Sequence, residues 1–140
     1  MTNRTIAFIV KEQTPIKLKS DETLRRACRL MAEKHVGSVL VVDESDRLIG
    51  IFTGRDAVRA VSKGLDPATT VLASAMTRDP LTIEPSKRSI DALRMMWDGG
   101  FRHLPVVEGG SIRGVVSRGD FKGVEIDRLD LEQHLWESIR

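Results

Sequence analysis

The chain has 140 residues, 41% of them hydrophobic, which suffices for one domain or for two very small halves that share a core. Its 22 basic and 20 acidic residues nearly balance and are interspersed, so no nucleic-acid-binding stripe is expected. No stretch approaches the roughly 20 apolar residues of a membrane span, and the short apolar start lacks the length and cleavage site of a secretion signal. The single cysteine excludes an internal disulfide, and no Cys/His cluster has metal-ligand spacing. We expect a soluble, cytoplasmic protein with no membrane, nucleic-acid or metal partner.

The first half of the chain begins with an extended segment followed by a helix. Residues 1–13 form an N-terminal segment and lead-in, and the extended segment runs from Ile16 to Leu18. The polar run Ser20-Asp21-Glu22 is typical of a helix start. Apolar residues then recur at helical spacing and place four side chains on one face: Leu24, Ala27, Cys28 and Met31. Cys28 is expected to be a buried, unreactive thiol on this face.

Two strands and a second helix are expected next. The run Ser38-Val39-Leu40-Val41-Val42 predicts a buried strand, and a turn returns the chain along residues 48–53. The second helix opens at Arg55. Gly, Asp and Pro turn signals then mark a linker over residues 64–78, with a short helical segment at 71–76.

The second half repeats this order at a spacing of 65, which changes to 64 at the turn between the two strands. An extended segment from Leu81 to Ile83 leads to a cap at Ser86. The following helix has Ile90, Leu93 and Trp97 on its apolar face, with Met96 nearby. Strands at 103–107 and 112–117 precede a helix that opens at Gly119. Residues 127–140 predict a C-terminal amphipathic helix, with a stripe of Leu131, Leu135 and Ile139.

One motif is present in both halves, as Gly50-Ile51-Phe52-Thr53-Gly54-Arg55-Asp56 and as Gly114-Val115-Val116-Ser117-Arg118-Gly119-Asp120. Internal repetition of this kind is a strong indicator of fold. We predict a first repeat at 14–63 and a second at 79–126, each with β-α-β-β-α order. Because one such unit is marginal alone, the two are expected to pack about a pseudo-twofold axis, with two equivalent clefts between them. The predicted fold class is α/β (α+β).

The residue types of this motif suit a ligand site. A glycine within a strand marks a close approach to the backbone, here at Gly50 and Gly114. The apolar pair after each glycine can cover one side of a flat heterocycle. Thr53 and Ser117 lie at a strand-to-helix corner, where a hydroxyl can donate to a phosphate. Asp56 and Asp120 provide acceptor oxygens for the paired hydroxyls of a ribose.

A second interpretation needs no ligand. The same residues fit a helix N-cap with an acidic third residue, worth about 1 kcal/mol for each helix. Both roles can coexist.

The chain resembles a tandem pair of cystathionine-β-synthase (CBS) domains, also called a Bateman module. The resemblance covers about Ile6 to Val124 and rests on both motif copies, on His103-Leu104-Pro105-Val106-Val107 and on Ala75-Met76-Thr77-Arg78-Asp79-Pro80. It implies paired β-α-β-β-α units that bind adenosine-containing ligands, such as AMP, ADP, ATP, NAD or S-adenosylmethionine. It also implies a regulatory role without catalysis, and frequent dimerisation.

The resemblance also implies roles for individual residues. The Thr or Ser of each motif contacts phosphate and the Asp holds the ribose, while Ile16 and Leu81 contact adenine. Basic residues facing the phosphates are expected at Arg102 and His103, with Arg55 and Arg118 as further cations. The matching positions of the first repeat, Gly37 and Ser38, carry no charge, so the second half is better equipped for a charged phosphate. The expected ligand-binding set is Ile16, Gly37, Gly50, Ile51, Thr53, Arg55, Asp56, Leu81, Arg102, His103, Gly114, Val115, Ser117, Arg118 and Asp120.

The expected function is therefore a non-enzymatic sensor that binds an adenine nucleotide in the clefts between the repeats and signals by conformational change. No catalytic cofactor is expected, and the partners are a second copy of the chain and an unidentified regulated protein. The alternative is a structural dimerisation or protein-interaction module with no physiological nucleotide, whose motifs only cap helices. An oligonucleotide-binding protein would need a basic stripe, which the sequence does not suggest.

Overall fold

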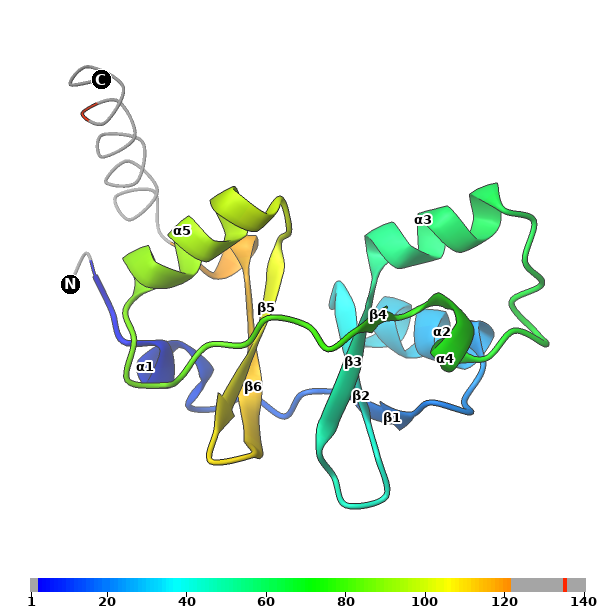
Figure 1. Cartoon of the computed structure of the whole chain (residues 1–140), viewed down its shortest axis with the longest axis horizontal. Helices are drawn as coiled ribbons and strands as arrows, with labels where there is room; N and C mark the ends of the chain where they lie inside the picture. The colour runs from blue at the N-terminus through cyan, green and yellow to red at the C-terminus, as the bar shows by residue number, and fades with distance from the viewer. Residues whose placement is uncertain (1–2, 122–134, 136–140) are drawn as a thin grey trace. The chain divides into compact units, whose positions relative to one another are not determined.

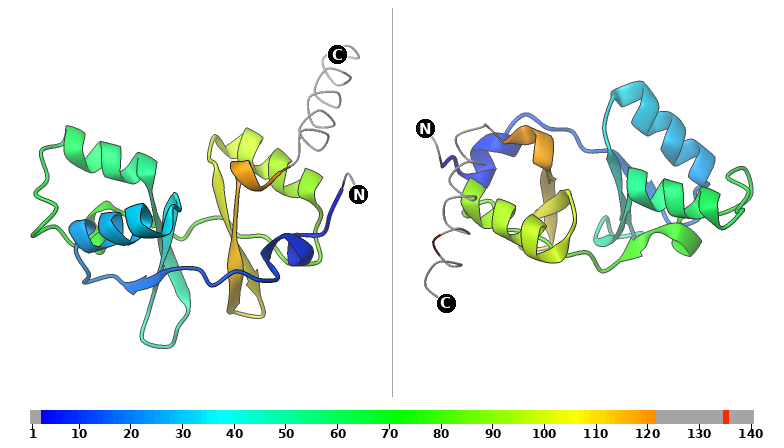
Figure 2. Two further views of the ribbon diagram at one scale, coloured as in Figure 1. Left: turned by 180° about the vertical axis from the view of Figure 1, so that it is seen from behind. Right: turned by 90° about the horizontal axis from the view of Figure 1, so that it is seen from above.

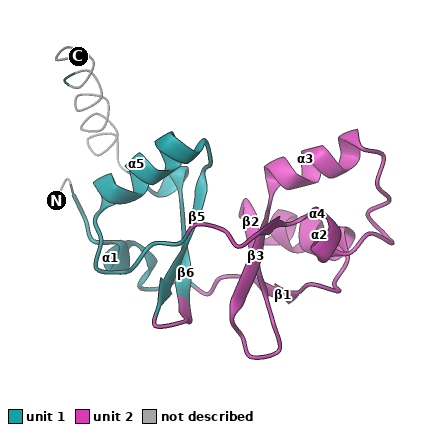
Figure 3. Ribbon diagram, in the orientation of Figure 1, with its two compact units in different colours: residues 1–13, 82–108, 113–140 teal, residues 14–81, 109–112 magenta. Residues whose placement is uncertain are grey.

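The computed structural model describes residues 3–121 and Leu135. Its fold is mixed α and β, as the sequence predicts, and the helices and strands follow one another as drawn in Figure 1. The chain divides into two compact units (Figure 3). Unit 1 comprises residues 1–13, 82–108 and 113–140, and unit 2 comprises residues 14–81 and 109–112. The predicted C-terminal helix at 127–140 lies outside the described residues, apart from Leu135.

Unit 2 contains a four-stranded sheet in the order β1-β2-β3-β4. Strand β1 (Lys17–Lys19) is parallel to β2 (Ser38–Val42), which is antiparallel to β3 (Leu48–Thr53). The two-residue strand β4 (Thr77–Arg78) pairs antiparallel with β3. All five residues of β2 are buried, as the predicted buried strand requires. In both views of Figure 2 the unit 2 helices lie on one side of this sheet: α2 (Leu24–Lys34), α3 (Gly54–Ser62) and α4 (Leu72–Ala75).

Helix α2 buries Leu24, Ala27 and Met31, as predicted, but it does not begin where the sequence suggested. Its N-cap is Thr23, whose hydroxyl accepts a 3.2 Å hydrogen bond from the backbone N–H of Arg26. The predicted cap at Ser20-Asp21-Glu22 is therefore wrong. The backbone of this run binds α4 instead, because the carbonyls of Ser20 and Glu22 accept hydrogen bonds from the N–H groups of Ala73 and Leu72.

Unit 1 contains helix α1 (Ile6–Val10), helix α5 (Ser89–Gly99) and the antiparallel strands β5 (His103–Glu108) and β6 (Ser111–Ser117). A short 3₁₀ turn, η1 (Arg118–Asp120), follows β6 at the position where a helix was expected to open. Of the predicted extended segment from Leu81 to Ile83, only Ile83 bridges a strand, at Val106.

Two predictions about α5 are wrong. Its N-cap is Arg88 and not Ser86, and Trp97 is 58% exposed although the apolar spacing suggested a buried side chain. Met96, which is 2% exposed, completes the buried face together with Ile90 and Leu93. The buried stripe thus follows the spacing i, i+3, i+6, which carries Trp97 past the edge of the core.

Each unit has its own hydrophobic core. The unit 1 core includes Ile6 and Val10 of α1, and the unit 2 core includes Leu72 of α4. Equivalent backbone contacts fix both short helices. Ile6 N–H donates to the carbonyl of Lys87, just before α5, and Leu72 N–H donates to the carbonyl of Glu22, just before α2. The segment ahead of each repeat is therefore built into the core of the other repeat's unit. None of the helices in the described part of the chain is both long and apolar enough to span a membrane.

Candidate functional site

The first motif forms the corner between β3 and α3 in unit 2. Thr53 is the N-cap of α3, and its hydroxyl accepts a 3.3 Å hydrogen bond from the backbone N–H of Asp56. The Asp56 carboxylate accepts in return from the backbone N–H of Thr53 at 3.0 Å. This reciprocal pair is a capping box, so the second interpretation of the motif is correct for its structural role in this repeat.

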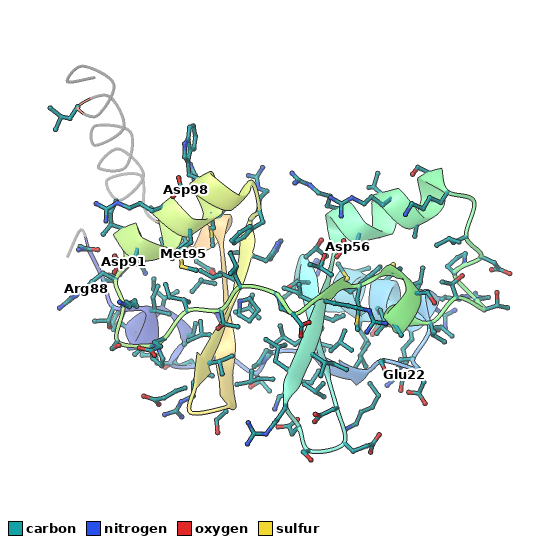
Figure 4. The ribbon with its side chains drawn as sticks, in the orientation of Figure 1. Glu22, Asp56, Arg88, Asp91, Met95 and Asp98 are labelled. Carbon is teal, nitrogen blue, oxygen red and sulfur yellow. The ribbon has the colours of Figure 1, made fainter. Side chains whose placement is uncertain are left out.

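Asp56, labelled in Figure 4, is only 3% exposed and has further partners. Its carboxylate also accepts from the hydroxyl of Thr53 at 3.2 Å, from the hydroxyl of Thr77 at 3.2 and 3.4 Å, and from Nη1 of Arg59 at 3.3 Å. A carboxylate has about four lone-pair sites. The carboxylate of the first motif is therefore fully engaged by protein groups.

The second motif makes the same turn with fewer partners. The Asp120 carboxylate accepts from the backbone N–H of Ser117 at 2.7 Å and from its hydroxyl at 3.3 Å. Within the described part of the chain, these are the only hydrogen bonds to this carboxylate, which belongs to a half-buried residue. The Asp120 backbone carbonyl accepts from Nη2 of Arg4 at 2.7 Å. As far as residues 3–121 are concerned, Asp120 therefore retains acceptor sites that Asp56 lacks.

The residue that precedes each buried strand lies against the motif of its own unit. The backbone N–H of Gly54 donates to the carbonyl of Gly37 at 3.1 Å, and the N–H of Arg118 donates to the carbonyl of Arg102 at 2.9 Å. In unit 1 this bond brings the cationic residues Arg102 and Arg118 to the Asp120 corner. In unit 2 the same positions are held by Gly37 and Gly54.

His103 also belongs to the unit 1 corner. Burial lowers the pKa of its imidazole, the nearby Asp120 carboxylate raises that pKa, and the Arg102 guanidinium lowers it further. The net shift of the pKa is downward, so His103 is mainly neutral at pH 7, with one ring nitrogen as a hydrogen-bond donor and the other as an acceptor.

Both motif glycines mark a close approach, and in both cases the neighbour is another part of the chain. A β-carbon on Gly50 would lie 2.6 Å from Sδ of Met76 and 3.0 Å from the Thr77 carbonyl oxygen. A β-carbon on Gly114 would lie 2.7 Å from Oε1 of Gln13 and 2.8 Å from Cβ of Val10. The segment after α4 thus packs on the first motif, and the segment after α1 packs on the second.

These two contacts differ in chemistry. Strand β4 pairs with β3 in a ladder that places Ile51 opposite Thr77. On β6 the Val115 N–H donates to the side-chain oxygen Oε1 of Gln13 at 2.8 Å. A glutamine side chain thus binds β6 at the position where a backbone strand binds β3.

The structure brings the predicted residues together in two sets. Unit 2 places Gly37, Gly50, Ile51, Thr53, Arg55 and Asp56 around the first corner, and unit 1 places Arg102, His103, Gly114, Val115, Ser117, Arg118 and Asp120 around the second. Ile16 is half-buried and packs on the unit 2 core, whereas Leu81 is 60% exposed. The assignment of all of these residues to a ligand remains a prediction.

Sequence reasoning missed Thr77, Arg59 and Gln13. Thr77 lies in the run Met76-Thr77-Arg78-Asp79-Pro80, which supported the family resemblance but was given no role. It directly follows the predicted helical segment at 71–76, which gave no indication that it contacts Asp56. Nothing in the sequence singles out Arg59 or Gln13.

A reactive thiol, a metal-binding cluster and a pocket are the other features that could support chemistry. Partial burial raises the pKa of the Cys28 thiol, so this cysteine is not activated as a nucleophile. Across residues 3–121 and Leu135, no three His, Cys, Asp or Glu side chains gather in a group that could hold a metal ion. A pocket of about 200 Å³ lies in unit 2, with Asp56, Arg59, Lys63, Met76 and Thr77 among its lining residues.

Comparison with known proteins places this geometry in a family. The CBS domain family matches residues 10–63 and 72–126 of the chain. The CBS domain-containing protein CBSCBSPB2 of Arabidopsis thaliana is 41% identical over 125 residues, which are 89% of this chain and 21% of that protein. An uncharacterized 17.7 kDa protein of Acidianus ambivalens is 34% identical over 112 residues, which are 79% of this chain and 66% of that protein. The chain spans about a fifth of the length of the Arabidopsis relatives.

Solved structures agree with this assignment. A protein with CBS domains from Burkholderia ambifaria MC40-6 is similar with a TM-score of 0.78 and 34% identity, covering 84% of this chain and 90% of that chain. The CBS domain protein PAE2072 from Pyrobaculum aerophilum shares the fold with a TM-score of 0.82 at 22% identity, covering 91% of this chain and 99% of that chain. The CBS domain pair of protein MJ0100 shares it with a TM-score of 0.76 at 22% identity, covering 90% of this chain and 98% of that chain. The two matched segments together cover most of the sequence, and the chain belongs to the CBS-domain family, with two CBS domains in tandem.

Proposed function

We propose that the chain is a non-enzymatic regulatory module that binds an adenosine-containing nucleotide through its Ser/Thr–Asp corners. The observation that carries this proposal is the corner of unit 1, where Ser117 is the one described residue that binds the Asp120 carboxylate and where Arg102, His103 and Arg118 lie nearby. Carboxylate oxygens suit the paired hydroxyls of a ribose, and guanidinium groups suit phosphate oxygens. The corner thus offers complementary groups to both polar parts of a nucleotide.

Two structural relatives support an adenosine ligand. PAE2072 was solved in complex with AMP, and the MJ0100 domain pair in complex with 5′-methylthioadenosine and S-adenosyl-L-methionine. The ligands of these proteins share an adenosine part and differ in what is attached to it. For this chain we propose AMP, ADP or ATP as the first candidates, with NAD and S-adenosylmethionine as further ones. Adenine contacts at Ile16 and Leu81, and a ligand position between the repeats, are part of the proposal.

The regulatory step would be differential binding. A ligand that binds one conformation of the module more tightly shifts the population toward that conformation, and a protein partner then reads the change. A homodimer in the cytoplasm, acting on a regulated protein, completes the proposal.

Thermal unfolding with AMP, ADP, ATP, NAD and S-adenosylmethionine tests the proposal. A ligand at 100 times its Kd adds about 2.7 kcal/mol to the free energy of unfolding. For a chain of this size we expect the Tm to rise by about 5–10 °C. The substitution Asp120→Asn should strongly reduce this shift, because it removes the anionic acceptor of the second motif and leaves only the corner of the first.

Asp91→Asn is a matched control for this experiment. Asp91 accepts from the backbone N–H of Arg88 at 2.9 Å at the start of α5, which is the bond that Asp120 makes with Ser117. This control should lower the Tm of the free protein and leave the ligand-induced shift intact. If Asp91→Asn removes the shift as well, the binding site is not at Asp120.

The alternative function is a protein-interaction module without a nucleotide. The observation that favours it is the first corner, where the Asp56 carboxylate is buried and satisfied by Thr53, Thr77 and Arg59. Under this alternative no nucleotide changes the Tm, and Asp120→Asn lowers the stability of the free protein only. The same experiment therefore separates the two functions.

A further inference from the structure

The two Asp residues of the repeated motif differ in what already binds them. Asp56 accepts from two groups of Thr53, from the Thr77 hydroxyl and from the Arg59 guanidinium, and it is 3% exposed. Asp120 accepts only from Ser117 within the described residues. A ribose hydroxyl can therefore be added at Asp120, whereas at Asp56 it must replace a hydrogen bond that the protein already makes.

Thr77 is the partner of Asp56 that comes from outside the motif. It lies in β4, opposite Ile51, and the Gly50 backbone allows the preceding Met76 sulfur to pack closely on β3. The β-ladder thus holds the Thr77 hydroxyl at 3.2 and 3.4 Å from the two carboxylate oxygens. Thr53 also binds the carboxylate, but it is the N-cap of α3, and Arg59 is the third residue after Asp56 in the same helix.

The space beside this bond can admit a ligand group. Asp56 and Thr77 both line the pocket of about 200 Å³, and the residue Thr77 is exposed. The Thr77 hydroxyl can therefore turn to solvent when a competing donor reaches Asp56, while β4 stays paired. Of the two hydroxyls that bind Asp56, that of Thr77 is the one that lies outside the capping box, so its release disturbs no capping bond.

We infer that Thr77 is a positioning residue that lowers the nucleotide affinity of the first CBS repeat by binding Asp56, and so makes the two repeats unequal. This inference rests on the proposed function. Its consequence is that the second repeat binds nucleotide first, and that the linker strand β4 sets the affinity of the first repeat. A substitution that removes the Thr77 hydroxyl destabilises the free protein and strengthens ligand binding, which are effects of opposite sign.

Isothermal titration calorimetry with AMP tests this inference. The titrations compare the parent chain, Asp120→Asn, Asp120→Asn/Thr77→Val and Asp120→Asn/Thr77→Ser, so that binding at the first repeat is seen alone. Valine keeps the shape of threonine without the hydroxyl. We expect the Kd of Asp120→Asn/Thr77→Val for AMP to be about tenfold lower than that of Asp120→Asn, which is the effect of one hydrogen bond to a charged group. Serine keeps the donor, so the Thr77→Ser variant should bind AMP like Asp120→Asn.

The outcomes separate this inference from the proposed function. A lower Kd with valine but not with serine supports the inference, together with a lower Tm of the free valine variant. If the parent chain binds AMP and valine leaves the Kd unchanged or raises it, Thr77 has a structural role only and the inference is wrong. It is also wrong if the parent binds AMP but neither Asp120→Asn nor its valine derivative does. If the parent chain binds none of AMP, ADP, ATP, NAD and S-adenosylmethionine, the proposed function fails and the inference fails with it.

Discussion

At the scale of single residues, the first glycine of each motif copy has no room for a side chain. Gly50 and Gly114 are both buried, and each lies against a segment that comes from elsewhere in the chain. We expect Gly50→Ala to lower the free energy of unfolding by about 1–3 kcal/mol, because the new methyl group would overlap Met76 and the Thr77 backbone. Urea unfolding monitored by circular dichroism measures this loss.

Gly54→Ala is the matched control, four residues away in the same motif. A β-carbon at Gly54 would meet nothing within 4 Å, and Gly54 is the first residue of α3, where alanine favours the helix. This variant should be neutral or more stable by up to about 1 kcal/mol. Equal losses in the two variants would contradict a steric role for Gly50.

His103 gives the second residue-scale prediction. Because burial lowers its pKa below the ordinary value of 6.5, the unfolded chain binds a proton more readily than the folded one. The contribution of His103 to the free energy of unfolding is therefore fully present above pH 6.5. It is lost as the pH falls through the pKa of this histidine in the unfolded chain and then through its lower pKa in the folded chain. We expect the difference in free energy of unfolding between pH 7.5 and 5.0 to be smaller in His103→Asn than in the parent chain. An identical pH dependence in both proteins would show that His103 titrates normally.

At the scale of elements, the start of a helix depends on local capping hydrogen bonds and on contacts with the rest of the fold. Thr23 and Thr53 each accept one backbone hydrogen bond at the start of a helix, at 3.2 and 3.3 Å. Thr53 in addition donates to the buried Asp56 carboxylate. We expect Thr23→Ala to cost about 1 kcal/mol and Thr53→Ala about 2 kcal/mol, since the latter also weakens the solvation of a buried charge. Guanidinium unfolding of both variants measures the difference, and equal costs would show that the hydroxyl adds nothing to Asp56.

Much of this element order could be predicted from the sequence, because periodicity is a local property. The face of α2 with Leu24, Ala27 and Met31 and the buried strand β2 follow from spacing alone. The cap of α2 could not be found this way, since the Ser20-Asp21-Glu22 backbone is used to bind α4, which is about 50 residues further along the chain. Strand β4 was likewise missed, because two residues carry no periodic signal and pair only when β3 is present.

For the candidate site, the sequence predicted the residues that form the two corners. The duplicated motif identified Thr53, Asp56, Ser117 and Asp120 and the corner geometry of each. The sequence could not show that the two aspartates differ, because Thr77 reaches one of them across 21 positions of the chain.

At the scale of the whole chain, each of the two short lead-in helices, α1 and α4, packs in the unit of the repeat that it does not directly precede. Residues 1–13 precede the first repeat but belong to unit 1 with the second motif, and α4 precedes the second repeat but belongs to unit 2. A linear repeat pattern cannot reveal this exchange, because a lead-in of the same length can join either core. The core of each unit is thus completed by the segment that precedes the other repeat.

Ile6 and Leu72 provide a matched test of this exchange, since each is 0% exposed and each anchors one lead-in helix. We expect Ile6→Ala and Leu72→Ala each to lower the free energy of unfolding by about 2–5 kcal/mol, through lost burial and the cavity left behind. Hydrogen exchange read by mass spectrometry should separate them. Ile6→Ala should loosen peptides from 82–108, and Leu72→Ala should loosen peptides from 14–62. If Ile6→Ala instead loosened the neighbouring residues 14–62 and spared 82–108, the N-terminal helix would belong to the repeat that follows it in sequence, and the exchange of lead-in segments would be wrong.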